Sequence, residues 1–448
     1  MASPKKTQRR KQAVKRSTVR HTRAIQVDRT KRPNSIPLDE QVSERLTQIL
    51  HPATLAQVAH FHELGLRERL LTLPVMVAVV LTMIWRQVGS VSELTRLLNT
   101  EGFLWCSSVS VSQPALSERL RVLPAVLFQR ILHDVLPQMH ARWAARTRSL
   151  PRELAWVRER YYRVLAVDGS TLDALRRKVG LLRDAAQNPL AGRMTALLDL
   201  CSRLPWEIWY EEDPQAHDQR CWARIRSTVA AGSLLLYDLG YTNFAVFRQL
   251  TEQGVTWLTR AKSNLTYAVA EVLLETPTVR DRLVWIGSGP DRQQVRLAEV
   301  LVGRAWRRYL TSELDPQRLP AVKVAALYGH RWRIEEAYLV TKRLLGLAYF
   351  WTGAENGVQL QLWATWLLYA VVIDLTDAVA ERLGQPFAAV SVEMVYRGVY
   401  YFTQAYHRGE ATDPVGYLAQ HARLLGILKR PRKRSPTRNS LLTVASGA

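Results

Sequence analysis

Two aspartates stand where apolar runs end, each followed closely by a turn residue. Asp168 ends the run that starts at Val164, and Asp238 ends the run that starts at Leu234, two residues before Gly240. Short apolar runs of this kind are typical of buried strands, so both carboxylates are expected to leave a sheet at its edge. That position suits a metal ligand, but for either aspartate alone a turn or a helix cap is the commoner role.

A third acid lies in a helical pattern further along the chain. Four residues are separated by offsets of 3, 4 and 7, which are multiples of the helical turn: Tyr328, Arg331, Glu335 and Lys342. On one helix these side chains would share a single face, bringing a phenol, a guanidinium, a carboxylate and an ammonium to one cleft. The spacing of Arg331 and Glu335 also occurs on ordinary surface helices, and spacing alone favours that role.

Taken together, these motifs resemble the signature of a known enzyme family. The two strand-end aspartates, a β-rich stretch and the pattern Y-xx-R-xxx-E-xxxxxx-K resemble bacterial DDE transposases of the insertion-sequence-four family, over about residues 160–380. The resemblance implies a ribonuclease-H-like catalytic core in which Asp168, Asp238 and Glu335 are the catalytic, metal-binding acids. Glu336 is an alternative third acid, but the spacing to Lys342 favours Glu335.

The same resemblance implies cofactors, partners and a reaction. Two Mg²⁺ ions, with Mn²⁺ as a substitute, would stabilise the entering and leaving oxygens of a phosphodiester during cleavage at transposon ends and strand transfer into target DNA. Tyr328, Arg331 and Lys342 would bind DNA phosphates, Arg331 through its planar fork and Lys342 as a point charge. Synapsis of two double-stranded DNA ends would require a homodimer.

The elements that must position these residues follow from hydrophobic periodicity. The catalytic domain is expected over residues 155–383, as an α/β fold with a mixed sheet and a β-rich insertion at 265–320. Strands are predicted at 164–168, 194–200, 206–210, 234–238 and 255–261, and helices at 218–229 and 244–253. Asp218 is expected to cap the first of these helices beside a surface His217, and both are left out of the site.

An all-helical DNA-binding domain is expected before the core, over residues 35–150. Within it, Ser90 and Ser112 each open a short helix as a capping residue. The pair resembles a helix-turn-helix, whose second helix would present Arg119 and Arg121 to DNA. Capped helix pairs are equally common in helical bundles, so both interpretations stay open.

Positive charge gathers at the two ends of the chain. The net charge is +23 and the pI about 10.3, which favours an acidic polymer as partner. Residues 1–34 are predicted to be a disordered basic tail, and residues 384–448 a helical region that ends in a second basic tail. Such tails bind phosphates without reading base sequence, and a solubilising role is the alternative.

No targeting or membrane segment is expected from the sequence. Cys106, Cys201 and Cys221 lack paired spacing, which favours a reducing compartment. The longest apolar run, residues 362–373, is short of the roughly 20 residues that span a bilayer. We therefore expect a cytoplasmic, nucleoid-associated bacterial protein that does not bind membranes.

Two other functions share most of these residues. An inactive DNA-binding relative would keep the basic tails and lose the metals, although all three acids are present here. A nuclease without strand transfer would share every residue named, and only the phosphate-binding residues Tyr328, Arg331 and Lys342 favour the transposase.

Overall fold

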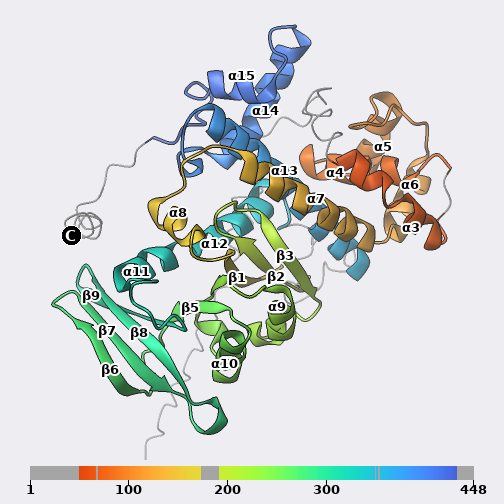
Figure 1. Cartoon of the computed structure of the whole chain (residues 1–448). Helices are drawn as coiled ribbons and strands as arrows, with labels where there is room; N and C mark the ends of the chain where they lie inside the picture. Colours follow the sequence, from red (N-terminus) through yellow and green to blue (C-terminus); the bar gives the residue numbers. More distant parts are fainter. Residues whose placement is uncertain (1–49, 67–68, 173–190, 349, 352–353, 431–448) are drawn as a thin grey trace, which may run out of the picture.

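The computed structural model describes residues 50–66, 69–172, 191–348, 350–351 and 354–430. Within these ranges the chain is a mixed α/β protein built on one sheet (Figure 1). The tail predicted at residues 1–34 and the basic end of the chain from residue 431 lie outside the described residues, so their predicted disorder stays a prediction.

Nine strands form one mixed sheet in the order β3-β2-β1-β4-β5-β9-β8-β7-β6. β1 pairs in parallel with β4, and β4 with β5, whereas the other neighbouring strands are antiparallel. The strands are β1 (Val164–Thr171), β2 (Arg193–Asp199), β3 (Pro205–Glu211), β4 (Leu234–Leu236), β5 (Thr256–Arg260), β6 (Ala268–Glu275), β7 (Val279–Ile286), β8 (Gln293–Val302) and β9 (Ala305–Thr311).

The central strands are apolar on both faces because both faces are covered. Side chains alternate along a strand, and in β1 Ala166 packs into the larger hydrophobic cluster while Leu165 and Val167 pack into the smaller one. A strand buried on both sides needs a continuous apolar run. This requirement explains the runs that lead to Asp168 and Asp238.

Helices form a layer on each side of the sheet. The smaller cluster joins the sheet to α9 (Trp222–Thr228) and α10 (Phe244–Glu252), with Ile225, Phe247 and Trp257 fully buried. The larger cluster joins the other face to α11 (Ala321–Gly329), α12 (Trp332–Leu339) and α13 (Glu355–Arg382). The short helical turns are η2 (Asp218–Cys221), η3 (Leu239–Tyr241), η4 (Gly289–Asp291), η5 (Val340–Leu344) and η6 (Phe387–Ala389).

The helices before the sheet share its larger core. They are α3 (Val58–Glu63), α4 (Leu73–Trp85), α5 (Val91–Thr100), α6 (Gln113–Val122), α7 (Val126–Ala145) and α8 (Arg152–Arg158). As predicted, Ser90 and Ser112 cap α5 and α6, accepting hydrogen bonds from the backbone N–H of Glu93 and Ala115. α4 and α7 pack on α13, as do α14 (Val392–His407) and α15 (Pro414–Gln420) from the C-terminal side.

α13 contains the apolar run of residues 362–373 and extends beyond it at both ends. By length and composition this helix could cross a membrane, but 94% of its apolar window is buried inside the protein. Polar side chains within and beside the apolar run, such as Gln361, Thr365 and Thr376, are themselves buried. α13 is therefore a core helix on which α4, α7, α14 and α15 pack.

A fully buried ion pair ties the β6–β9 strands to the helix that follows them. The guanidinium of Arg296 on β8 donates two hydrogen bonds, of 2.7 and 2.6 Å, to the carboxylate of Asp281 on β7. It also donates to the carbonyl of Leu319 at 2.7 Å, just before α11. Because α11 carries Tyr328, this pair helps to fix one end of the candidate site.

We predict that Asp281→Ala destabilises the protein by about 3–5 kcal/mol, because it leaves the Arg296 charge buried without a partner. The measurement is the urea midpoint of unfolding. The matched control is Glu252→Ala, which removes an exposed partner of Arg248 and should cost at most about 1 kcal/mol. Equal losses of stability in the two variants would show that the buried ion pair stabilises the protein no more than the exposed one.

Candidate active site

Parallel strands bring Asp168 and Asp238 to one edge of the sheet. Ala166 of β1 pairs with Leu236 of β4, and each aspartate follows two residues later, so the two lie level with each other. The Asp168 carboxylate accepts a hydrogen bond from the N–H of Gly169 at 2.9 Å. The Asp238 carboxylate accepts one from the N–H of Gly240 at 2.9 Å and so caps η3. Asp238 follows the end of β4, as the sequence predicts. Asp168 does not end its strand as predicted, because β1 continues to Thr171 through its pairing with β2.

Glu335 reaches the same edge from α12. Tyr338, one turn later on this helix, is buried and donates a hydrogen bond to the carbonyl of Asp168 at 2.5 Å, while its oxygen accepts one from the N–H of Ala196 at 3.1 Å. These bonds dock α12 onto β1 and β2. The side chain of Glu335 is about one third exposed, at 35%.

Arg331 links two of the three acids. Its Nη1 donates to Asp168 Oδ2 at 3.0 Å and its Nη2 donates to Glu335 Oε1 at 3.0 Å. The Arg331 side chain is only 9% exposed, so this charge lies inside the site. The guanidinium offsets the repulsion between two carboxylates that the fold forces together.

Burial and neighbouring charges change the protonation of Asp168. Burial raises the pKa of Asp168 to about 6; Arg331 opposes this shift, and the nearby carboxylates of Asp238 and Glu335 add to it. Burial also raises the pKa of Tyr328 to about 12, so this phenol stays a neutral hydrogen-bond donor. Asp168 therefore keeps its proton to a higher pH than an ordinary aspartic acid does.

The motif residues do not lie on one continuous helix as the spacing predicts. α11 ends at Gly329, Arg331 precedes α12, and Lys342 lies in the π-helical turn η5. Tyr328 still donates to the carbonyl of Tyr237, next to Asp238, at 3.3 Å, and Lys342 Nζ donates to the carbonyl of Thr171 at 2.6 Å. Because a break separates α11 from α12 and the wide turn η5 follows α12, the four motif residues lie along the edge of the sheet and not on one helix face.

Glu336, the alternative third acid, points elsewhere. Its carboxylate accepts a hydrogen bond from Arg203 at 2.6 Å and is 61% exposed. Neighbouring residues on a helix point about 100° apart, so only one of Glu335 and Glu336 can face Asp168. The contact with Arg331 assigns that position to Glu335.

Three further residues lie at this edge and were not included in the predicted site. Leu236 pairs with Leu258 of β5, so Arg260 at the end of β5 lies level with the two aspartates. Arg260 lies within the strand predicted over residues 255–261. Asp218 was expected to cap a helix, but His217 is the residue that accepts the capping hydrogen bond, from Gln219. The Asp218 carboxylate instead accepts a hydrogen bond from Arg193 of β2.

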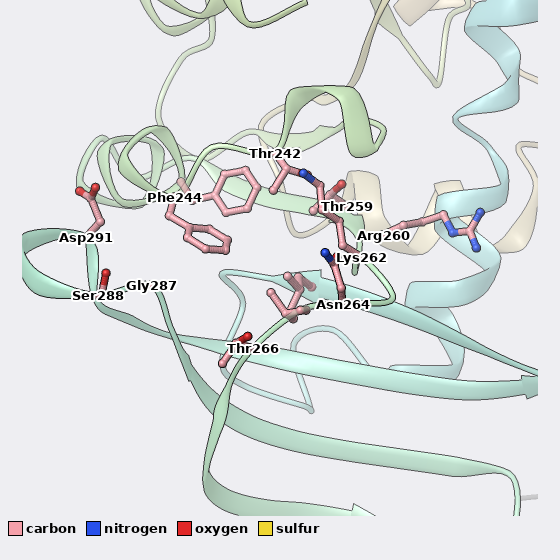
Figure 2. A pocket seen from close by; sticks show the side chains of 13 residues that line it. Thr242, Phe244, Thr259, Arg260, Lys262, Asn264, Thr266, Gly287, Ser288 and Asp291 are labelled. Atoms are coloured by element: carbon pink, nitrogen blue, oxygen red, sulfur yellow. The ribbon is translucent and has the colours of Figure 1, made fainter.

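A cavity of about 570 Å³ adjoins the loop that follows Asp238. Figure 2 shows Phe244 on one side of it and Lys262 and Asn264 on the other, with Ser288 across from them. The Arg260 side chain points away from this cavity toward the neighbouring helix. The cavity therefore offers an aromatic wall and a cation near the loop that follows Asp238, although Asp168, Asp238 and Glu335 do not line it.

Arg119 and Arg121 lie on α6, apart from the acids (Figure 1). Arg121 is 71% exposed and pairs with Glu118 at 2.6 Å, and Arg119 lies over the ring of Phe61 at 5.9 Å. The side chain of Asn99 on α5 holds the backbone of Val111 before α6 through two hydrogen bonds. These residues form a separate candidate DNA surface.

The acids are close, but they are not arranged as a finished metal site. Among the described residues, no group of three or more His, Cys, Asp or Glu side chains stands ready to hold a metal ion. Arg331 bridges Asp168 and Glu335 instead. The donor chemistry nevertheless fits a hard divalent cation, because the three groups are carboxylates.

The segment that carries these residues is similar to a transposase domain. Residues 160–371, just under half of the chain, match the family described as Transposase DDE domain. The chain is 28% identical over 164 residues to the protein named Putative transposase y4zB of Sinorhizobium fredii (strain NBRC 101917 / NGR234), covering 34% of this chain and 45% of that protein. The match thus spans less than half the length of this relative.

A solved structure with some likeness is that of the piggyBac transposase synaptic complex with hairpin DNA. It covers 91% of this chain and 89% of its own, at 10% identity and a TM-score of 0.43, which is too low to define a shared fold. The family match and the sequence relative support a DDE transposase. All three predicted acids fall inside the matched segment.

We predict that Asp168→Asn stabilises the metal-free protein near neutral pH. Because the pKa of Asp168 is higher in the folded protein than its ordinary value of 3.8, ionising it costs stability, and this cost grows as pH rises through about 6. With chelator present, the variant should gain about 1–3 kcal/mol at pH 7.5 and less at pH 5.

The measurement is thermal unfolding at the two pH values, with Glu336→Gln as a control that removes an exposed carboxylate from the same helix. The control should show no gain that depends on pH between these values. An Asp168→Asn protein less stable than wild type at pH 7.5 would mean that the bond to Arg331 outweighs the cost of burial.

Proposed function

We propose that this protein is a DNA transposase that cleaves strands at transposon ends and transfers them into target DNA. The observation that carries the proposal is the meeting of three acids at one sheet edge. Asp168 and Asp238 lie level with each other, each two residues beyond the last pair that joins the parallel strands β1 and β4, and Arg331 joins Glu335 to Asp168. This arrangement lies within the segment that matches a transposase domain.

The strand order supports a ribonuclease-H-like core. The first five strands follow the order β3-β2-β1-β4-β5, with three antiparallel strands continued by two parallel ones. β6–β9 then extend the sheet as the inserted β-rich segment. Within this family we assign the chain to the insertion-sequence-four group, whose Y-R-E-K signature corresponds to Tyr328, Arg331, Glu335 and Lys342.

Asp168, Asp238 and Glu335 would hold two Mg²⁺ ions, with Mn²⁺ as a substitute. Such a pair supplies charge stabilisation for the entering and leaving oxygens of a phosphodiester. The residues of this chain supply the rest of the site. The backbone N–H groups of Gly169 and Gly240 orient two of the carboxylates, and Tyr338 fixes the distance between α12 and β1.

Arg331 would change partners during the reaction. In the structure its charge is shared between Asp168 and Glu335. Cations that neutralise these carboxylates would weaken their attraction for the Arg331 guanidinium. The planar fork of this guanidinium suits a DNA phosphate equally well. Tyr328 and Lys342 lie on either side of it along the sheet edge, near Asp238 and Thr171, so the three residues would hold one strand along the acids.

DNA would also be bound away from the acids. The exposed face of α6 with Arg119 and Arg121 would contact double-stranded DNA as part of a helical DNA-binding domain over residues 35–150, and the basic tails would add contacts to phosphates. Residues 155–383 would form the catalytic domain, and residues 384–448 would serve protein contacts. We further propose a homodimer that pairs two transposon ends, in the bacterial cytoplasm at the nucleoid.

The test is Mg²⁺-dependent cleavage and joining of DNA that carries the ends of the element encoding this protein. Asp168→Asn, Asp238→Asn and Glu335→Gln should each lower both activities by about 10³-fold or more, because several kcal/mol of charge stabilisation are lost. DNA binding, measured by gel mobility shift, should persist. The matched control is Glu336→Gln, which should keep near wild-type activity.

Each other outcome selects a different function. An intact protein that cuts but never joins would be a nuclease, and one that binds without cutting would be an inactive DNA-binding relative. If Glu336→Gln were as damaging as Glu335→Gln, the assignment of the third acid would be wrong.

A further inference from the structure

We propose that Asp218 and Arg193 form a positioning pair that sets the distance between β1, which carries Asp168, and the loop that follows Asp238. This inference rests on the proposed function, since it concerns the same acids. It assigns a role to two residues outside the signature motif. Gly169 and Gly240, which follow the two aspartates, mark the position of the pair.

Glycine is favoured at positions 169 and 240 because other side chains approach the backbone closely there, and not because of the backbone conformation. Neither glycine has a φ in the left-handed region, so another residue could adopt the same backbone. A Cβ at Gly169, however, would meet the guanidinium of Arg193 and would lie 2.6 Å from Asp218 Oδ1. A Cβ at Gly240 would lie 2.8 Å from Asp218 Oδ2. The carboxylate of Asp218 thus stands against both β1 and the loop that follows Asp238, with one oxygen facing each.

Asp218 is held in this position from two sides. Arg193, at the start of β2 and opposite Thr171 of β1, binds its Oδ1. The turn η2 that begins with Asp218 is tied to the loop after Asp238, because Gln219 Nε2 donates to the carbonyl of Thr242 at 3.0 Å. Both side chains of the pair are mostly buried, with 17% and 21% exposed.

Arg193 offsets the charge that this fourth acid adds beside Asp238. The carboxylate of Asp218 is planar and held in place, so it fixes the separation of β1 from the loop that follows Asp238. Residues that orient metal ligands in this way typically change metal affinity by about 10–100-fold when they are removed.

The first experiment measures Mn²⁺ affinity of the full-length protein by isothermal titration calorimetry without DNA. Asp218→Ala and Arg193→Met should each weaken binding by about 10–100-fold, and the double variant should be little worse than either. Asp218→Asn keeps the shape and a hydrogen-bond acceptor for Arg193, so it should restore most of the affinity. The control is Asp213→Ala, which breaks an exposed pair with Arg220 on the same segment.

This pattern separates positioning from direct ligation. If Asp218 were itself a metal ligand, Asp218→Asn would lose as much affinity as Asp218→Ala, and Arg193→Met would leave binding unchanged or stronger. Either result overturns the proposal, as does unchanged affinity in Asp218→Ala.

The second experiment tests the contact without any metal. Gly240→Ala should lower the Tm, because its methyl group meets Asp218, and Asp218→Ala should recover much of that loss by vacating the space. Additive losses would overturn the proposed contact. A wild-type protein that binds no Mn²⁺ would count against the proposed metal chemistry, whereas the Tm comparison would still decide the role of Asp218.

Discussion

The gathering of like charges at one edge of the sheet is the constraint on which the rest of the structure depends. Two unit charges about 4 Å apart repel by roughly 4 kcal/mol in a partly buried site, and burial adds a further cost. The raised pKa of Asp168 is the direct sign of both effects. Two guanidiniums offset part of this cost, since Arg331 lies between Asp168 and Glu335 and Arg193 binds Asp218.

A site under such repulsion needs a rigid support, and the described chain supplies one. β1 and β4 are buried on both faces and held in a fixed parallel register. α12 is docked onto β1 by the phenol of Tyr338, while the pair of Asp281 and Arg296 secures the approach to α11. The acids therefore approach one another because the surrounding packing is stronger than their mutual repulsion.

Local patterns indicated that Asp168 and Asp238 follow buried strand residues, because a strand buried on both faces requires an apolar run, although β1 continues beyond Asp168 to Thr171. Glu335 was singled out by the resemblance of its motif to a known family, since spacing alone favoured an ordinary surface helix. Local patterns fail where the position depends on two distant segments. Asp218 reads as a helix cap in the sequence, and only the packing of η2 against η3 brings it to the acids.

Local patterns also failed to show the break in the helix that carries the motif, and they understate how deeply α13 is buried. Offsets of 3, 4 and 7 fit one continuous helix, but they also fit two helices with a break at residues 330–331 and a π-helical turn after the second. Both the break and the wider turn change the direction in which later side chains point, so the spacing alone does not distinguish the two arrangements. In α13, buried Gln and Thr side chains lie within and beside the apolar run in the sequence. Thr365 and Thr376 meet their hydrogen-bonding needs through carbonyls one turn earlier, so a polar residue type there does not imply an exposed face.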